Sequence, residues 1–142
     1  MIKPVKWEDQ HPGVHHAPFK ELLRLMPDLK PILESFPDNR QDFTWDVKVH
    51  MLMPKQYPCI PNWHRDSVPR IDGIQRMDLI NQSLPMYIWI SGPPLTQFQH
   101  GYLQANVWHR FSQEDVHRGR MSDNFCWRGM IRATHNKILK PK

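Results

Sequence analysis

The stretch FTWDVKVHMLM, residues 43 to 53, carries the clearest secondary-structure signal in the chain. Large apolar side chains occupy every second position from Phe43 to Met53, and between them stand Thr44, Asp46, Lys48 and His50. Because side chains alternate between the two faces of a strand, this pattern predicts a strand with one apolar and one polar face. For His50, on the polar face, the pattern favours a solvent-facing side chain or a hydrogen-bonded spacer.

The composition of the whole chain favours a β-rich fold around this strand. Fourteen prolines against six glycines disfavour long helices and favour short elements joined by rigid corners. A hydrophobic share of 39% with six tryptophans is typical of a folded domain, and 142 residues are most simply one such domain. We therefore predict a single, mainly β domain with short N-terminal helices.

The chain divides into three predicted regions: an arm with short helices over residues 1–42, a β core over residues 43–135 and a basic tail over residues 136–142. Apolar residues recur every three or four positions between Phe19 and Phe36, and Pro27 interrupts them, which predicts two short helices. Further strands are expected at residues 62–67, 86–91, 102–111 and 125–134.

Charge and cysteine usage limit the range of partners. The net charge is +5, but no basic run with interleaved aromatic residues is present, so nucleic-acid binding is only a weak possibility. Cys59 and Cys126 fit no metal or redox spacing, which favours two buried thiols in a reducing compartment. Without a signal peptide or a long apolar run, we expect a soluble cytoplasmic protein.

Two groups of histidines offer metal ligands. In the first, His11, His15 and His16, the residues Pro12 and Gly13 oppose the helix that would align the three rings, which favours an ordinary surface segment.

The second group begins with His64 and Asp66, which project from the same face if the segment is extended, and can then share one metal ion. His117 is the expected third ligand, and His109 is the alternative. Two histidines and one carboxylate form a facial triad, which leaves open coordination positions on Fe(II).

Two arginines follow on the last predicted strand. Arg128 and Arg132 share one face with Met130, while Trp127, Ile131 and Ala133 are on the other. A guanidinium presents a rigid fork of donors that grips a carboxylate with two hydrogen bonds. The two arginines are about 13 Å apart along a strand, so a single carboxylate is not expected to contact both.

The pattern of His64-x-Asp66, a distal His117 and a downstream arginine resembles that of the Fe(II)- and 2-oxoglutarate-dependent dioxygenases. The resemblance implies a double-stranded β-helix, or jelly roll, over roughly residues 43–135, with Fe(II) and 2-oxoglutarate in its mouth. It also implies that His64, Asp66 and His117 bind the iron and that Arg128, or alternatively Arg132, anchors 2-oxoglutarate. The implied activity is hydroxylation of a substrate that the sequence does not identify.

Two other functions remain open. The first is a non-catalytic jelly-roll protein that keeps a metal site and serves in a homo-oligomer or larger assembly, with its N-terminal arm lying across a neighbouring subunit. The second is a cupin-like dioxygenase without 2-oxoglutarate, although Asp66 stands where that class would place another histidine.

Overall fold

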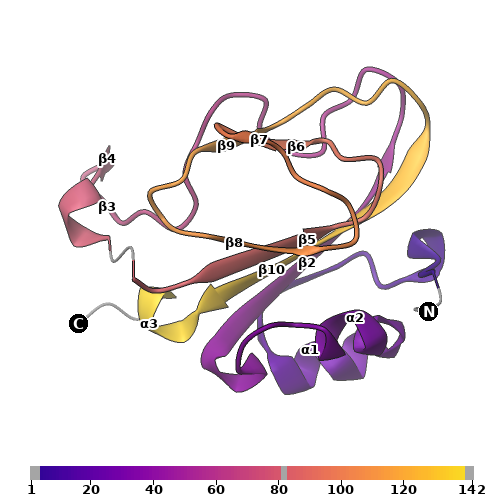
Figure 1. Ribbon diagram of the computed structural model, residues 1–142, viewed down its shortest axis with the longest axis horizontal. Helices are drawn as coiled ribbons and strands as arrows, with labels where there is room; N and C mark the ends of the chain where they lie inside the picture. The colour runs from indigo at the N-terminus through magenta and orange to yellow at the C-terminus, as the bar shows by residue number, and fades with distance from the viewer. Residues whose placement is uncertain (1–3, 81–82, 140–142) are drawn as a thin grey trace.

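The computed structural model describes residues 4–80 and 83–139, and this part of the chain forms three layers (Figure 1). The middle layer is a five-stranded antiparallel sheet in the order β1 (Gly13–Pro18), β2 (Phe43–Leu52), β10 (Cys126–His135), β5 (Met86–Ile90), β8 (Trp108–Phe111). A three-stranded sheet, β7 (Gly101–Tyr102), β6 (Thr96–Phe98), β9 (His117–Gly119), covers one face. The hairpin of β3 (Arg70–Ile71) and β4 (Ile74–Gln75) lies apart from both. The predicted mainly β class is confirmed.

Helices cover the other face of the five-stranded sheet. Helix α1 (Phe19–Leu25) ends before Pro27, a 3-10 turn follows over Pro27–Leu29, and α2 (Lys30–Glu34) continues from it, so the predicted interruption is confirmed. Shorter 3-10 turns span Trp7–Asp9, Arg40–Asp42 and Met77–Leu79. Within residues 4–80 and 83–139, no helix is long and apolar enough to cross a membrane.

Both predicted end regions contribute elements to this frame. Strand β1, in the predicted arm, pairs with β2 at one edge of the sheet. After β10, in the predicted basic tail, the short helix α3 (Asn136–Leu139) packs its buried Ile138 in a core with residues of β5, β6 and β8. Residues 1–3 and 140–142, the outer ends of the predicted arm and tail, lie outside the described residues.

Strands β2 and β10 pair in register along their whole length, from Cys126 opposite Leu52 to His135 opposite Phe43. Their faces bury two separate cores. One face contributes Trp45, Val47, Ile131 and Ala133 to a core shared with the helices. The other face lies toward the three-stranded sheet, where Ile88, Ile90, Phe98, Leu103 and Phe111 pack together. Among the polar residues on this face, Asp46 and Arg128 are buried, His50 and Arg132 are half-buried, and Lys48 is exposed.

All the predicted strands differ in some detail from those observed, although β2 and β5 only end one residue earlier than predicted. The predicted strand over residues 102–111 is two strands, β7 and β8, because Asn106 has a positive φ of 65° in the connection. The last strand begins at Cys126 and ends at His135, one residue later at each end than predicted. Residues 62–67 form no strand but a single antiparallel bridge between His64 and His117.

Candidate metal centre

A cavity of about 60 Å³ lies between the two sheets. It is bounded by residues from β2, β5, β6, β9 and β10 and from the proline-rich segment after β2. Its lining includes His50, His64, Asp66, His117, Arg128 and Arg132. All five residues that the sequence indicated for the metal site and its arginine anchor therefore line one space, together with His50.

Backbone hydrogen bonds to His117 hold His64 beside the cavity. Its N–H donates to the His117 carbonyl at 2.9 Å, and the His117 N–H donates back to the His64 carbonyl at 2.9 Å. Beside this bridge, the Arg65 Nε donates to the Glu114 carbonyl at 3.0 Å. These bonds hold the His64–Asp66 segment against the segment that carries His117, so two ligands far apart in sequence become neighbours.

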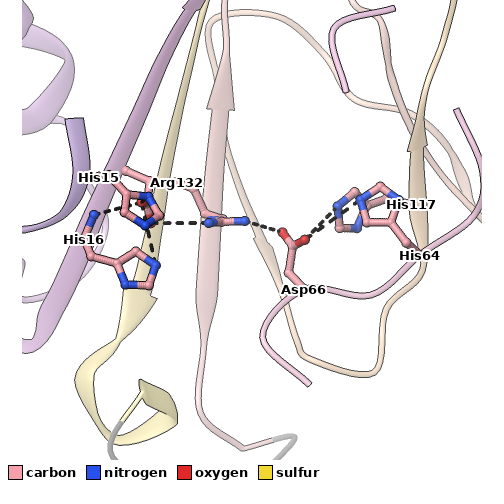
Figure 2. A network of polar contacts seen from close by, with 7 residues as sticks. His15, His16, His64, Asp66, His117 and Arg132 are labelled. Carbon is pink, nitrogen blue, oxygen red and sulfur yellow. Dashed lines mark hydrogen bonds and ion pairs between the residues drawn. The ribbon is translucent and has the colours of Figure 1, made fainter. Parts of the chain in front are cut away.

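The Nε2 atoms of two histidines face the same Asp66 oxygen (Figure 2). The Asp66 Oδ1 lies 3.5 Å from the His117 Nε2 and 3.9 Å from the His64 Nε2. On the far side of its ring, the His64 Nδ1 lies 2.9 Å from the Asn62 carbonyl, which can only accept a hydrogen bond. A proton on Nδ1 satisfies this carbonyl, and in that tautomer Nε2, the nitrogen nearer Asp66, is free to bind a metal. His64, Asp66 and His117 are together able to hold a metal ion.

The His117 ring is fixed by aromatic packing. It is 5% exposed, stacks on Phe98 at 5.0 Å between ring centroids and meets Phe111 edge-on at 5.9 Å. In the described part of the chain its Nδ1 has no hydrogen-bond partner. His117 therefore presents Nε2 to the cavity from a rigid, largely dry position.

The Asp66 carboxyl is held in its ionised form. Burial raises its pKa, but His117 and then Arg132 outweigh burial, and the net pKa lies well below the usual range. The Arg132 Nη1 donates to the Asp66 Oδ2 at 2.9 Å, which leaves Oδ1 facing the histidines. Asp66 therefore offers a metal one oxygen that is charged and oriented.

The two arginines of β10 have different surroundings. Arg132 bridges two carboxylates, since its Nη2 also donates to the Asp46 Oδ2 at 3.3 Å, and these anions raise its pKa against the effect of burial. Arg128 is 2% exposed, and its Nε and Nη2 have no hydrogen-bond partner within residues 4–80 and 83–139. Burial lowers its pKa. The Arg132 Nε also has no partner among the described residues, so the difference between the two guanidiniums is that Arg132 contacts two carboxylates and Arg128 contacts none of those described.

His109, the alternative third ligand, lies elsewhere. It belongs to β8, its Nε2 is 3.1 Å from the Gln104 carbonyl, and it is not part of the ligand group.

Two residues that line the cavity, His50 and Cys59, were not predicted from the sequence to belong to the site. His50 was expected on a solvated or spacer position but lines the cavity half-buried, opposite Arg128 in the β2–β10 register. Burial, with the nearby charges of Arg128 and Lys48, lowers its pKa. Cys59 also lines the cavity, and burial raises the pKa of its thiol. The only available signal was the alternation that places His50 on the face of Asp46.

Comparisons with known proteins give no family assignment. No protein-family model matches the chain, and no curated protein does. Among solved structures, the chain is similar to the crystal structure of protein NMB1881 from Neisseria meningitidis, with 15% sequence identity and a TM-score of 0.35. The match covers 75% of this chain and 96% of that one. We base no functional argument on a similarity of this size.

Proposed function

We propose that the protein is an Fe(II)- and 2-oxoglutarate-dependent dioxygenase with a jelly-roll fold. The observation that carries this proposal is a buried, incompletely paired arginine in the same cavity as a two-histidine, one-carboxylate ligand group. Either feature alone is compatible with many functions. Together they favour a site for a metal ion and a small carboxylate.

The strand pairing supports the jelly roll. From β2 onward, apart from the β3–β4 hairpin, eight extended segments follow in chain order: β2, the His64 bridge, β5, β6, β7, β8, β9 and β10. The first pairs with the last, the second with the seventh, the third with the sixth and the fourth with the fifth. These nested pairs alternate between the two sheets. This is the arrangement expected when one long hairpin is rolled into a double-sheet jelly roll.

The ligand group suits iron. Two imidazole nitrogens and one carboxylate oxygen on one side of an ion leave positions for a chelating co-substrate and oxygen, as in non-haem Fe(II) oxygenases. Because Arg132 occupies the Asp66 Oδ2, the carboxylate is set to bind through Oδ1 alone. The hydrogen bond from His64 to the Asn62 carbonyl supplies the outer support that metal-binding histidines ordinarily have.

Arg128 suits the distal carboxylate of 2-oxoglutarate. Buried N–H groups without acceptors are unfavourable, and a carboxylate can accept from the Arg128 Nε and Nη2 together. Arg132 already contacts two carboxylates, which favours Arg128 as the anchor. The small volume of the cavity favours a short dicarboxylate over a bulky anion.

The proposed roles of the chain follow from these positions. His64, Asp66 and His117 hold the ion, Arg128 orients the co-substrate, and Phe98 and Phe111 keep water from the His117 side. Iron with 2-oxoglutarate and oxygen supplies an oxidant that hydroxylates a C–H bond of the substrate, with formation of succinate and carbon dioxide.

An anaerobic titration tests the proposal. Adding 2-oxoglutarate to the Fe(II)-loaded protein should produce a visible metal-to-ligand charge-transfer band. The His64→Ala variant should lose the band, whereas His109→Ala, a matched control outside the ligand group, should keep it. A folded wild-type protein that binds Fe(II) but gives no band contradicts the proposal and favours a non-catalytic metalloprotein.

The anchor is tested separately by 2-oxoglutarate affinity. Arg128→Ala should weaken binding by roughly 10-fold or more, the loss of a charge-assisted bidentate contact. Arg128→Lys should restore part of the affinity, because it keeps the charge but not the fork. If Arg132→Ala weakens 2-oxoglutarate binding and Arg128→Ala does not, the assignment of the anchor is wrong.

The assembly alternative has a different structural requirement. In the structure, residues 13–18 of the N-terminal arm pair with β2 of the same chain. An arm that crosses to a neighbour would have to leave this pairing. We therefore rank the enzyme above an assembly protein.

A further inference from the structure

We propose that His15, His16 and Asp46 form a second site, which takes a divalent transition-metal ion such as Zn²⁺. This site lies on the far side of Arg132 from the first ligand group (Figure 2). It uses none of His64, Asp66 and His117, so the proposal does not rest on the dioxygenase assignment.

A β-bulge brings two consecutive histidines to one carboxylate. In the β1–β2 register, Val14 pairs with Val47 and Ala17 with Trp45, so two residues of β1 lie opposite one residue of β2. That one residue is Asp46. Consecutive side chains of a regular strand point to opposite faces, whereas a bulge redirects one of them. Here both imidazoles lie on the Asp46 side, with ring centroids 4.1 Å apart.

The bulge is locked in an uncommon backbone conformation. His16 has a φ of 49°, a region that residues other than glycine adopt infrequently. Its backbone N–H donates to the Asp46 Oδ1 at 2.9 Å. The same carboxylate thus fixes the loop of the bulge and faces its two side chains.

The donor atoms are close enough to share an ion. The Asp46 Oδ1 lies 3.2 Å from the His15 Nδ1 and 3.9 Å from the His16 Nε2, and the three ligand atoms lie within 4.8 Å of one another. Two ligands at about 2.1 Å from one ion in tetrahedral geometry are roughly 3.4 Å apart, so small movements of two exposed rings suffice.

The carboxylate of this site is buried and its two imidazoles are exposed, as expected for an ion site that is open to solvent. Asp46 is 3% exposed and its Oδ2 accepts from Arg132, so the carboxylate is held in one orientation with Oδ1 toward the two histidines. His15 and His16 are exposed, which leaves the remaining coordination positions to water or to a donor from another molecule. Two imidazoles with one carboxylate suit Zn²⁺, Ni²⁺ or Cu²⁺, whereas Mg²⁺ and Ca²⁺ prefer oxygen ligands.

Ion counting on tag-free protein, stripped with chelator and dialysed against Zn²⁺, tests the site. Wild type should bind one more Zn²⁺ than His15→Ala and one more than His16→Gly. The glycine variant removes the imidazole and also relieves the positive φ, so loss of the ion cannot be ascribed to unfolding. His11→Ala is the matched control in the same segment and should keep the wild-type count.

His64→Ala separates the two proposals. This variant should lose only the ion bound by His64, Asp66 and His117. If that first group binds no metal at all, wild type should still bind one Zn²⁺, and His15→Ala should lose it. Nitrogen NMR should also show Zn²⁺-dependent shifts at the His15 Nδ1 and the His16 Nε2. Equal Zn²⁺ counts in wild type, His15→Ala and His16→Gly would overturn the second site.

Discussion

Replacing Arg132 by methionine should destabilise the metal-free protein by about 3 kcal/mol. The substitution keeps an unbranched apolar stem but removes the charge that contacts both Asp66 and Asp46. Removing one partner of a buried ion pair costs roughly 3–5 kcal/mol, because the other charge stays buried and unpaired. The Arg132 side chain is 19% exposed, and both carboxylates keep histidine neighbours, so we expect the lower end of that range.

Urea unfolding at neutral pH in the presence of chelator measures this loss, with the fluorescence of the six tryptophans as the signal. At about 4 °C per kcal/mol, the thermal midpoint should fall by roughly 12 °C. Arg132→Lys should lose less, because an ammonium can still neutralise one of the two carboxylates. A loss below about 0.5 kcal/mol for Arg132→Met would refute the reasoning, since that is the size expected of a solvated surface pair.

Three further predictions concern stability. Because the pKa of His50 is lowered on folding, the unfolded chain binds the extra proton below about pH 6.5, and stability should fall with acidification there; His50→Asn should reduce this slope in urea titrations between about pH 5 and 8. Gly129→Ala should lower the free energy of unfolding by about 1–3 kcal/mol, since the new Cβ would lie 2.2 Å from the Trp7 ring. In a mutant cycle, Gly129→Ala should cost less in a Trp7→Ala background than in wild type, because the clashing ring is then absent. In a His15→Ala background, a divalent ion at 100 times its Kd should raise the free energy of unfolding by about 2.7 kcal/mol, and His117→Ala should abolish this gain.

The alternation of side chains could be predicted from sequence because it is a local property of extended backbone. The face shared by Arg128, Met130 and Arg132 is observed, and their neighbours Ile131 and Ala133 are buried on the opposite face. Alternation does not reveal what covers each face. His50 was therefore expected to face solvent or to serve as a hydrogen-bonded spacer, whereas it lines a cavity beneath a second sheet built from residues far along the chain.

The His64 segment is the opposite case: the predicted strand was wrong, but His64 and His117 lie close together as predicted. Residues 62–67 were expected to form a strand, but only His64 forms a bridge, and Ser67, with a φ of 60°, leaves the extended conformation that a strand requires. That bridge still joins His64 to His117. The bulge at His15 and His16 was not readable either, because its shape depends on pairing with Asp46.

The charges enclosed around the cavity bear on what it binds. Arg128, Arg132 and Asp66 line the cavity, and Asp46 lies beside Arg132, so the two positive and two negative charges of these four groups cancel before any ligand enters. Lys48 also lines the cavity, but its side chain is exposed to solvent, which screens its charge. A divalent ion alone would leave a net charge of +2 in a poorly solvated space, which is unfavourable. A dicarboxylate would restore neutrality, with one end at the ion and the other at Arg128. In the proposed complex each ligand therefore strengthens binding of the other by the same factor, as linkage requires. A monocarboxylate would cancel only half of the added charge, so the same cavity should discriminate against it even where its length fits.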